Sequence, residues 1–177
     1  MTDEKPHQKH KTMAKKKLRI GVITVSTSRY YAGIEEGGTK DESGDVICEL
    51  ARKAGHVIVF RSLVSDFKPD IRLKTLEATK FQVDVILLTG GTGVSPTDVT
   101  IESIKPLLDK ELPGFGEIFR LESIKQIGGA AMLSRALLGI MNDIVVVCLP
   151  GSPEGVRLGM KILLPELPHI VSIATGG

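Results

Sequence analysis

The sequence has little cysteine, no long apolar run and no apolar segment near its start, and each absence excludes a class of protein. No stretch approaches the roughly 20 apolar residues that a membrane-spanning helix needs. The N-terminal residues lack the apolar core of a secretory signal, so a cytoplasmic location is expected by default. The two cysteines, Cys48 and Cys148, lie in apolar stretches, and we expect them to be buried free thiols without a redox role.

The positive charge is concentrated at the N-terminus. The whole chain has a formal net charge of +2, but residues 1–17 hold six lysines against Asp3 and Glu4, which leaves residues 18–177 slightly acidic. We expect residues 1–17 to form a disordered basic tail, and residues 18–177 to form the folded domain. The alternative is that the tail contacts nucleic acid or an anionic surface. Neither nucleic acid nor a membrane is an expected partner of the domain itself.

Apolar, β-branched segments alternate with helical patterns along the rest of the chain. Runs of Val, Ile and Leu predict strands at residues 18–26, 56–64, 83–89 and 144–149. Apolar spacing, with Pro and Gly at the ends, predicts helical segments at residues 46–54, 69–80, 101–108, 114–125, 130–138 and 152–164. Residues 28–43 are polar and predict a long loop. The alternation predicts a single-domain, doubly wound α/β fold with a mostly parallel sheet and helices on both faces.

Small, hydroxyl and carboxylate residues follow the ends of the predicted strands. In an open parallel sheet, ligands bind beyond the carboxyl ends of the strands. The residues found there, taken strand by strand, are Ser26, Thr27 and Ser28, then Ser65 and Asp66, then Gly90 to Gly93 and Asp98, and finally Pro150, Gly151 and Ser152. This composition predicts a site for a phosphate-bearing ligand.

The loop after the third strand, Gly90-Gly91-Thr92-Gly93, is the most informative segment. Its glycines allow a tight turn and bring backbone N–H groups close to an anion. A helix expected to begin near Val99 directs its positive end at the same place. A plain tight turn is the alternative, because the loop lacks the Lys-Ser/Thr of a Walker A sequence and the glycine spacing of a dinucleotide site.

Asp66 and Asp98 are candidate ligands for Mg²⁺. Each follows a strand end on the expected ligand-binding edge. Mg²⁺ is commonly held by one or two carboxylates together with substrate phosphates. An acid at such a position can also be a solvated loop residue or a helix cap, so this alternative stays open.

Several segments, in order and spacing, resemble the molybdopterin adenylyltransferase family, which comprises the MogA/MoaB group of bacteria and archaea and the matching domain of eukaryotic gephyrin. The resemblance runs from Leu18 to about Ile170, and Pro106 and residues 114–120 are closer to the MoaB branch. It rests on Thr89 to Gly93 followed by Asp98-Val99-Thr100, and on the segments 41–44, 63–66, 112–117, 133–136 and 149–153.

The resemblance implies a Mg²⁺-dependent nucleotidyltransferase that joins the adenylyl group of ATP to molybdopterin and releases pyrophosphate. A downstream enzyme would then insert molybdate. By the same resemblance, Asp66 and Asp98 are catalytic residues and metal ligands. The phosphates of the nucleotide are expected at Ser26, Gly90, Gly91, Thr92 and Gly93. Molybdopterin is expected at Ser43, Gly44, Ser134, Arg135, Pro150, Gly151 and Ser152.

The resemblance also implies a homotrimer, or a hexamer in the MoaB-like branch. The alternative function is a molybdopterin-binding protein of the same fold with little or no transferase activity. Two residue roles stay open as well, because Arg135 can form an ion pair on a helix surface and Ser152 can serve only as a helix N-cap. The chain departs from many members at two positions, with Thr27 in place of Asp or Asn and Thr97 in place of Arg.

Overall fold

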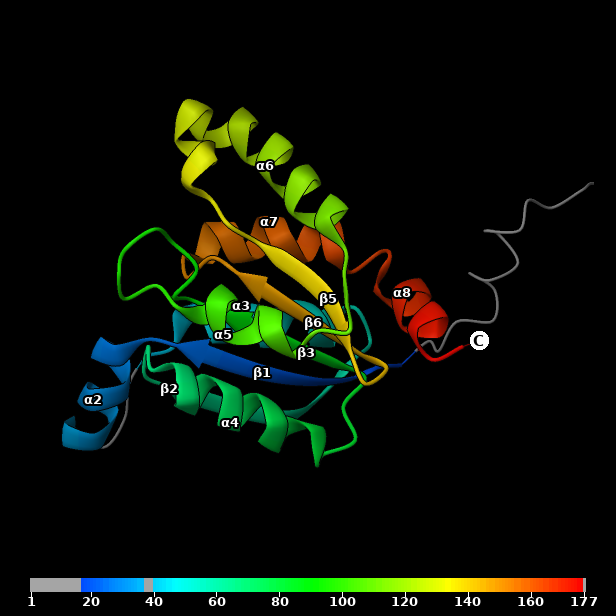
Figure 1. Ribbon diagram of the computed structural model, residues 1–177, viewed down its shortest axis with the longest axis horizontal. Helices are drawn as coiled ribbons and strands as arrows, with labels where there is room; N and C mark the ends of the chain where they lie inside the picture. Colours follow the sequence, from blue (N-terminus) through cyan, green and yellow to red (C-terminus); the bar gives the residue numbers. More distant parts are fainter. Residues whose placement is uncertain (1–16, 37–39, 177) are drawn as a thin grey trace, which may run out of the picture.

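A six-stranded sheet forms the centre of the molecule, in a computed structural model that describes residues 17–36 and 40–176 (Figure 1). The order across the sheet is β2-β1-β3-β6-β5-β4. Four strands are parallel to one another: β1 (Arg19–Val25), β2 (Val57–Val64), β3 (Val85–Thr89) and β6 (Ile144–Leu149). The other two, β5 (Leu137–Met141) and β4 (Lys110–Glu111), are antiparallel additions. The tail expected at residues 1–17 lies outside the described residues, except for Lys17.

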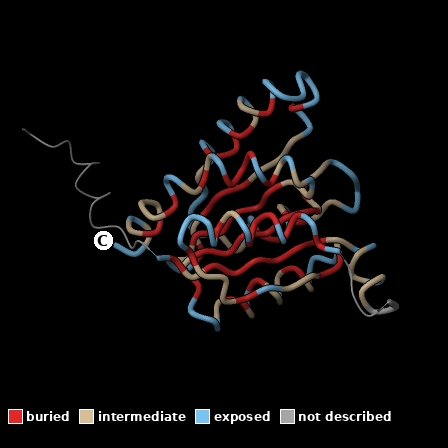
Figure 2. Tube along the Cα trace, turned by 180° about the vertical axis from the view of Figure 1, so that it is seen from behind, coloured by how far each residue is buried: buried red, intermediate tan, exposed pale blue. Residues whose placement is uncertain are grey.

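Helices cover both faces of this sheet, which confirms the predicted doubly wound α/β domain. One face packs against α3 (Glu42–Lys53), α6 (Pro113–Ile127), α7 (Pro153–Leu163) and α8 (Leu167–Ala174). The other face packs against α4 (Lys68–Thr79) and α5 (Thr100–Ile104). Figure 2 shows the strands as the buried centre, with exposed segments around them. None of the helices in residues 17–36 and 40–176 is long and apolar enough to cross a membrane.

The parallel strands alternate their side chains between two apolar clusters. Val22 and Val147 face α3 and α7, whereas Ile23 and Leu88 face α4 and α5. Because both faces are covered, the strands are continuously apolar, as their sequences indicated. Both cysteines are buried free thiols, as expected, and burial raises the pKa of each one. The two thiols therefore stay protonated at neutral pH.

The loop predicted over residues 28–43 is wrong at residues 28–36, because a helix begins directly after β1. Residues 37–39 of that prediction lie outside the described residues. The helix, α2 (Thr27–Glu36), lies beyond the end of β1 in Figure 1. The backbone N–H of Tyr30 donates to the carbonyl of Ser26 at 2.9 Å, so the helix begins at once. The next helix, α3, also begins earlier than predicted, because the Asp41 side chain caps it by accepting the backbone N–H of Gly44 at 3.0 Å.

The predicted helix over residues 130–138 is also wrong in its second half. A 3-10 helix, η2 (Gly128–Leu133), ends there, and β5 follows as a strand paired with β6. Asn142 and Asp143 connect β5 to β6 as a turn: their φ values of 46° and 63° suit the two central residues of a tight hairpin. At Pro106 the helix α5 gives way to a second 3-10 helix, η1 (Lys105–Leu107).

The four parallel strands define two edges of the sheet, which are named here by chain direction. The carboxyl edge is the one where β1, β2, β3 and β6 end, and the amino edge is the one where they begin. In Figure 1, α2 lies at the carboxyl edge and α8 at the amino edge. Helices that follow parallel strands begin at the carboxyl edge, so their positive ends gather there.

Candidate functional site

The loops that follow β3 and β6 touch at the carboxyl edge. The backbone N–H of Gly90 donates to the carbonyl of Leu149 at 3.1 Å. The hydroxyl of Thr89 donates to the carbonyl of Pro150 at 2.8 Å. A Cβ on Gly151 would lie only 3.0 Å from the Cα of Gly90, so the two glycines permit this approach. The predicted segments 90–93 and 150–152 therefore form one continuous surface.

Two hydrogen bonds from Thr100, the first residue of α5, hold the glycine loop (Gly90–Gly93) in place. The Thr100 N–H donates to the carbonyl of Gly91 at 2.9 Å, and the Thr100 hydroxyl donates to the carbonyl of Gly90 at 2.8 Å. Both glycines have positive φ, 93° and 60°. The N–H groups of Gly91, Thr92 and Gly93 donate to no group within residues 17–36 and 40–176. The loop is thus a tight turn that also leaves three successive donors for an anion.

Asp66 is fixed on this surface by Thr27, the first residue of α2. The Thr27 backbone N–H and hydroxyl both donate to Oδ2 of Asp66, at 2.7 and 2.8 Å. The N–H of Asp66 donates back to the Thr27 hydroxyl at 2.9 Å. The other carboxylate oxygen, Oδ1, lies against the glycine loop, since a Cβ on Gly91 would be 2.7 Å from it.

Asp98 lies at the far end of the same loop. Its Oδ2 accepts the backbone N–H of Ser95 at 2.9 Å, and its own N–H donates to the carbonyl of Ser95 at 2.9 Å. A Cβ on Gly93 would lie 2.7 Å from Oδ2 of Asp98. The two predicted aspartates therefore flank the glycine loop, with Asp66 beside Gly91 and Asp98 beside Gly93.

The donor set at this edge fits Mg²⁺ with substrate phosphates. Asp66 and Asp98 each keep one oxygen, Oδ1, that accepts no hydrogen bond from the residues that the structure describes. No group of three or more His, Cys, Asp or Glu that could hold a metal occurs among the described residues. Mg²⁺ does not need such a group, because it is usually bound through one or two carboxylates, water and phosphate oxygens.

The beginning of α3 joins the surface from the other side of β1. The Ser43 hydroxyl donates to the carbonyl of Gly151 at 2.7 Å. Gly44 follows in the first turn, where any side chain would collide with Asp41. Asp41 is buried and also accepts the Thr24 hydroxyl at 2.8 Å and Arg61 at 2.9 Å. Ser43, Gly44 and Gly151 are therefore brought together, as predicted.

Arg135 forms the ion pair that the sequence left open. Its Nη1 and Nη2 donate to the carboxylate of Glu102 at 2.6 and 3.4 Å, and its Nε donates to the carbonyl of Thr92 at 2.8 Å. The hydrogen bond from Arg135 lowers the pKa of Glu102. The guanidinium therefore ties the segment that includes Ser134 to the glycine loop and α5.

Ser152 is the N-cap of α7, whose side chain accepts the N–H of Gly155 at 3.1 Å. Ser26 lies next to Thr27 at the end of β1, and its hydroxyl lies 3.3 Å from that of Ser28. The hydroxyls of Ser152 and Ser26 therefore both lie at the carboxyl edge. The cap alone accounts for Ser152, so a role in ligand binding stays a prediction for it.

Four participants at this edge were not assigned a role from the sequence. Thr27 was noted as a residue after the first strand and as a departure from the family, and Asp41, Glu102 and Thr100 received no role. Each acts by holding another group in place, through a hydrogen bond to a residue distant in the sequence or on a neighbouring element. The positions of strand ends can be recognised from the sequence pattern. The hydrogen-bond partners of a residue cannot, because they depend on which strands lie side by side in the sheet. For Asp41, the pattern Asp-x-x-Gly before an apolar run was a usable signal for a helix N-cap.

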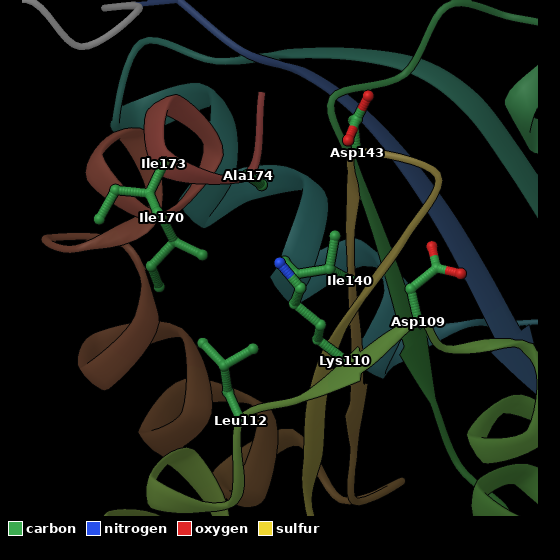
Figure 3. A pocket seen from close by; sticks show the side chains of 8 residues that line it. All are labelled: Asp109, Lys110, Leu112, Ile140, Asp143, Ile170, Ile173 and Ala174. Atoms are coloured by element: carbon green, nitrogen blue, oxygen red, sulfur yellow. The ribbon is translucent and has the colours of Figure 1, made fainter. Parts of the chain in front are cut away.

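A cavity lies at the opposite, amino edge. It has a volume of about 250 Å³ and lies between α8 and the β4–β5–β6 strands. Figure 3 shows Leu112, Ile170 and Ile173 around this space, with Ile140 and Lys110 on the strand side. The other lining residues are Asp109, Asp143 and Ala174. This cavity is mostly apolar and contains none of the predicted site residues.

The carboxyl edge has the features of an α/β protein that binds a phosphate-bearing ligand. A family model described as a probable molybdopterin binding domain matches residues 21–169. Molybdenum cofactor biosynthesis protein B of Bacillus cereus is 45% identical over 164 residues, which cover 91% of this chain and 93% of that protein. The chain belongs to this family of molybdopterin-binding domains, as its sequence indicated.

Two further relatives support the assignment. A molybdopterin adenylyltransferase of Pyrococcus furiosus is 41% identical over 171 residues, which cover 94% of this chain and 97% of that protein. The crystal structure of a tungsten cofactor synthesizing protein, MoaB, from Pyrococcus furiosus has a TM-score of 0.81 and 42% identity, and the match covers 91% of this chain and 99% of that chain. These names agree with the MoaB branch predicted from Pro106 and residues 114–120.

Proposed function

We propose that the chain is a nucleotidyltransferase that adenylylates molybdopterin with ATP. The observation that carries the proposal is the arrangement of Asp66 and Asp98 on either side of a loop with three available N–H donors. The relative named molybdopterin adenylyltransferase, with 41% identity over most of both chains, supports the same reaction.

In this reaction an oxygen of the molybdopterin phosphate attacks the α-phosphorus of ATP. A new P–O–P bond forms, the bond between the α- and β-phosphates breaks, and pyrophosphate leaves with the electron pair. The attacking phosphate is already anionic, so no side chain has to remove a proton. The barrier comes from bringing two anions together, and positioning and charge compensation are what the protein has to supply.

The residues of the carboxyl edge meet these demands in different ways. The N–H groups of Gly91, Thr92 and Gly93 bind phosphate oxygens of ATP, next to Ser26. Asp66 and Asp98 would hold Mg²⁺, and the metal would neutralise phosphate charge.

The molybdopterin subsite lies between the starts of α3 and α7. Ser43, Gly44, Gly151 and Ser152 border it together with Pro150, and Ser134 and Arg135 approach from the η2–β5 connection. The guanidinium of Arg135 is already bonded to the Glu102 carboxylate, so Arg135 binds a phosphate only by releasing that carboxylate.

The test is pyrophosphate release by the purified chain supplied with molybdopterin and ATP, with Mg²⁺ added or withheld. We expect release and adenylylated molybdopterin, identified by mass spectrometry, only when Mg²⁺ is present. Molybdopterin binding without either product would instead identify the chain as a binding protein of the same fold. Product formed equally well without Mg²⁺ would contradict the metal assignment to Asp66 and Asp98.

The surface of α6 and η2 supports the expected assembly into homotrimers or hexamers. Six apolar residues are exposed there, an unusual concentration for a monomer: Ile118, Leu121, Ile124, Ile127, Met132 and Leu133. A second copy that covers this surface would remove it from water. Light scattering at micromolar concentration tests the assembly, and a monomeric mass would contradict it. The product would pass to an enzyme that inserts molybdate, in the cytoplasm where ATP is available.

A further inference from the structure

Thr27 and Asp66 are joined by hydrogen bonds that run in both directions. Three hydrogen bonds join them: two from Thr27 to Oδ2 of Asp66, and one from the Asp66 N–H back to the Thr27 hydroxyl. They stand 39 positions apart in the sequence, at the ends of the neighbouring strands β1 and β2. No other residue in the described part of the chain forms a hydrogen bond with the Asp66 carboxylate.

This pairing makes the two oxygens of Asp66 unequal. Oδ2 is saturated by the N–H and the hydroxyl of Thr27, whereas Oδ1 is turned towards Gly91. A free carboxylate on an exposed loop would rotate about its side-chain bonds and present either oxygen. We propose that Thr27 is the positioning residue for Asp66, which fixes the carboxylate so that Oδ1 faces the phosphates and metal held at the glycine loop.

Packing in the core does not explain why a threonine occupies position 27. Thr27 is exposed, and it belongs to neither apolar cluster of the sheet. Gly91 has no side chain that would support Asp66 from the other side. Thr27 also begins α2, so the same bonds tie the first turn of that helix to Asp66. Helix capping alone is therefore the structural role that an experiment has to separate from positioning.

The inference rests on the proposed function, and two substitutions of Thr27 test it. Thr27→Val keeps the shape and the backbone donor but removes both bonds that use the hydroxyl. Thr27→Ser keeps all three bonds. Thr79→Val is a matched control, because the Thr79 hydroxyl also donates a hydrogen bond, to the carbonyl of Leu76 at 2.7 Å in α4, and lies outside the site.

Positioning predicts a specific pattern of effects. In Thr27→Val, we expect kcat to fall at least tenfold and the Mg²⁺ concentration for half-maximal rate to rise at least fivefold, with little change in the KM for molybdopterin. The Kd for ATP in the presence of Mg²⁺, measured by calorimetry without molybdopterin, should also rise at least fivefold. Thr27→Ser and Thr79→Val should stay within twofold of the wild type in each measurement.

The outcomes distinguish this proposal from the proposed function. A Thr27→Val enzyme with a lower melting temperature but unchanged Mg²⁺ dependence and ATP affinity would show that Thr27 only caps α2, and would overturn the proposal. If the wild type releases no pyrophosphate, the proposed function fails, and the calorimetric Kd values alone decide the role of Thr27. A wild type that neither binds ATP with Mg²⁺ nor turns over would overturn both.

Discussion

The carboxyl and amino edges of the same sheet have opposite surfaces. At the carboxyl edge, glycines and hydroxyls surround Asp66 and Asp98 on an open surface of loops. At the amino edge, α8 and the β5–β6 hairpin enclose an apolar cavity of about 250 Å³ (Figure 3). The apolar cavity is thus not the place where the predicted site residues gather. The carboxyl edge combines free backbone donors with two carboxylates, and the family match indicates molybdopterin as a ligand of the chain.

The difference follows from the direction of the chain. Helices that come after parallel strands begin at the carboxyl edge, so N–H groups and side chains that cap helices gather there. Ser152 and Asp41 are two such caps. At the amino edge the helices end and the parallel strands begin, and the side chains there mainly cover the apolar core. The comparison predicts that changes at the carboxyl edge affect turnover, whereas changes at the amino edge affect stability.

Asp98→Asn should have the largest effect on turnover. The substitution keeps the shape of the side chain and removes the charge proposed to hold Mg²⁺, so we expect pyrophosphate release to fall by about 10²–10³-fold or more. Molybdopterin binding should change little. Asp143→Asn, at the amino-edge hairpin, is the control, because asparagine tolerates the positive φ of 63° there. Similar rates for both variants would remove the functional distinction between the edges.

Gly91→Ala should affect folding and binding together. The residue has φ of 60°, and a Cβ would lie 2.5 Å from the Thr100 hydroxyl and 2.7 Å from Oδ1 of Asp66. We expect the free energy of unfolding to fall by about 1–3 kcal/mol and ATP affinity to fall more than tenfold.

Gly55→Ala is the matched control for that prediction. Gly55 has φ of 88° at the amino edge, but a Cβ there would meet nothing within 4 Å. The substitution should therefore cost stability through the backbone alone, without any change in the Kd for ATP measured by calorimetry. Equal loss of affinity in both variants would mean that Gly91 is only a turn residue.

Ile140→Ala tests the amino-edge cavity itself. Ile140 is half-buried and packs on the apolar cluster beside α8. Its truncation should lower the free energy of unfolding by about 1–3 kcal/mol in urea titrations, as expected for a partly buried side chain. kcat/KM should stay at the wild-type value below the unfolding transition. Lower kcat/KM in the folded variant would indicate that the cavity takes part in the reaction.

His56 should give the smallest effect, a dependence of stability on pH. It is buried at the start of β2, and burial lowers the pKa of its imidazole. Its Nδ1 accepts the backbone N–H of Leu18 at 3.4 Å, so the neutral ring carries its proton on Nε2. The unfolded chain binds the proton more readily, so stability present above pH of about 6.5 is lost as the pH falls, at up to about 1.4 kcal/mol per unit.

The measurement for His56 is a set of urea titrations between pH 7.5 and 5, on the wild type and on His56→Gln. The substitution removes the titrating group and keeps a polar side chain. The difference between the two proteins should shrink as the pH falls, because only the wild type has to protonate His56. A constant difference would show that His56 does not titrate over this range.

The sequence predicted the parallel strands and the residues that follow them, because continuous apolar runs and glycine-rich strand ends are local signals. It did not predict α2, whose sequence has little apolar periodicity and whose first residue is hydrogen-bonded to Asp66, in the loop after β2. The start of β5, residues 137 and 138, was predicted as the end of a helix, because the apolar run of this strand is short and its identity depends on pairing with β6.

The candidate site divides in the same way. Positions such as Asp66, Asp98 and Gly91 were found from their place after strands and from the family resemblance. The partners that orient them were not, because Thr27 and Glu102 act through side chains that meet only in the fold. For Arg135 the sequence left two roles open, a phosphate ligand or a member of an ion pair. In the structure, Arg135 forms an ion pair with Glu102.

Hydrogen exchange of the full chain, with and without ATP and Mg²⁺, tests most directly whether the carboxyl edge is the ligand site. Exchange reports local opening along the backbone, so protection marks the segments that a ligand stabilises. We predict protection at residues 26–28, 65–67 and 90–98, with no change at residues 109–112 and 170–174 around the amino-edge cavity. Protection confined to the amino-edge segments, or none at the glycine loop, would contradict the account.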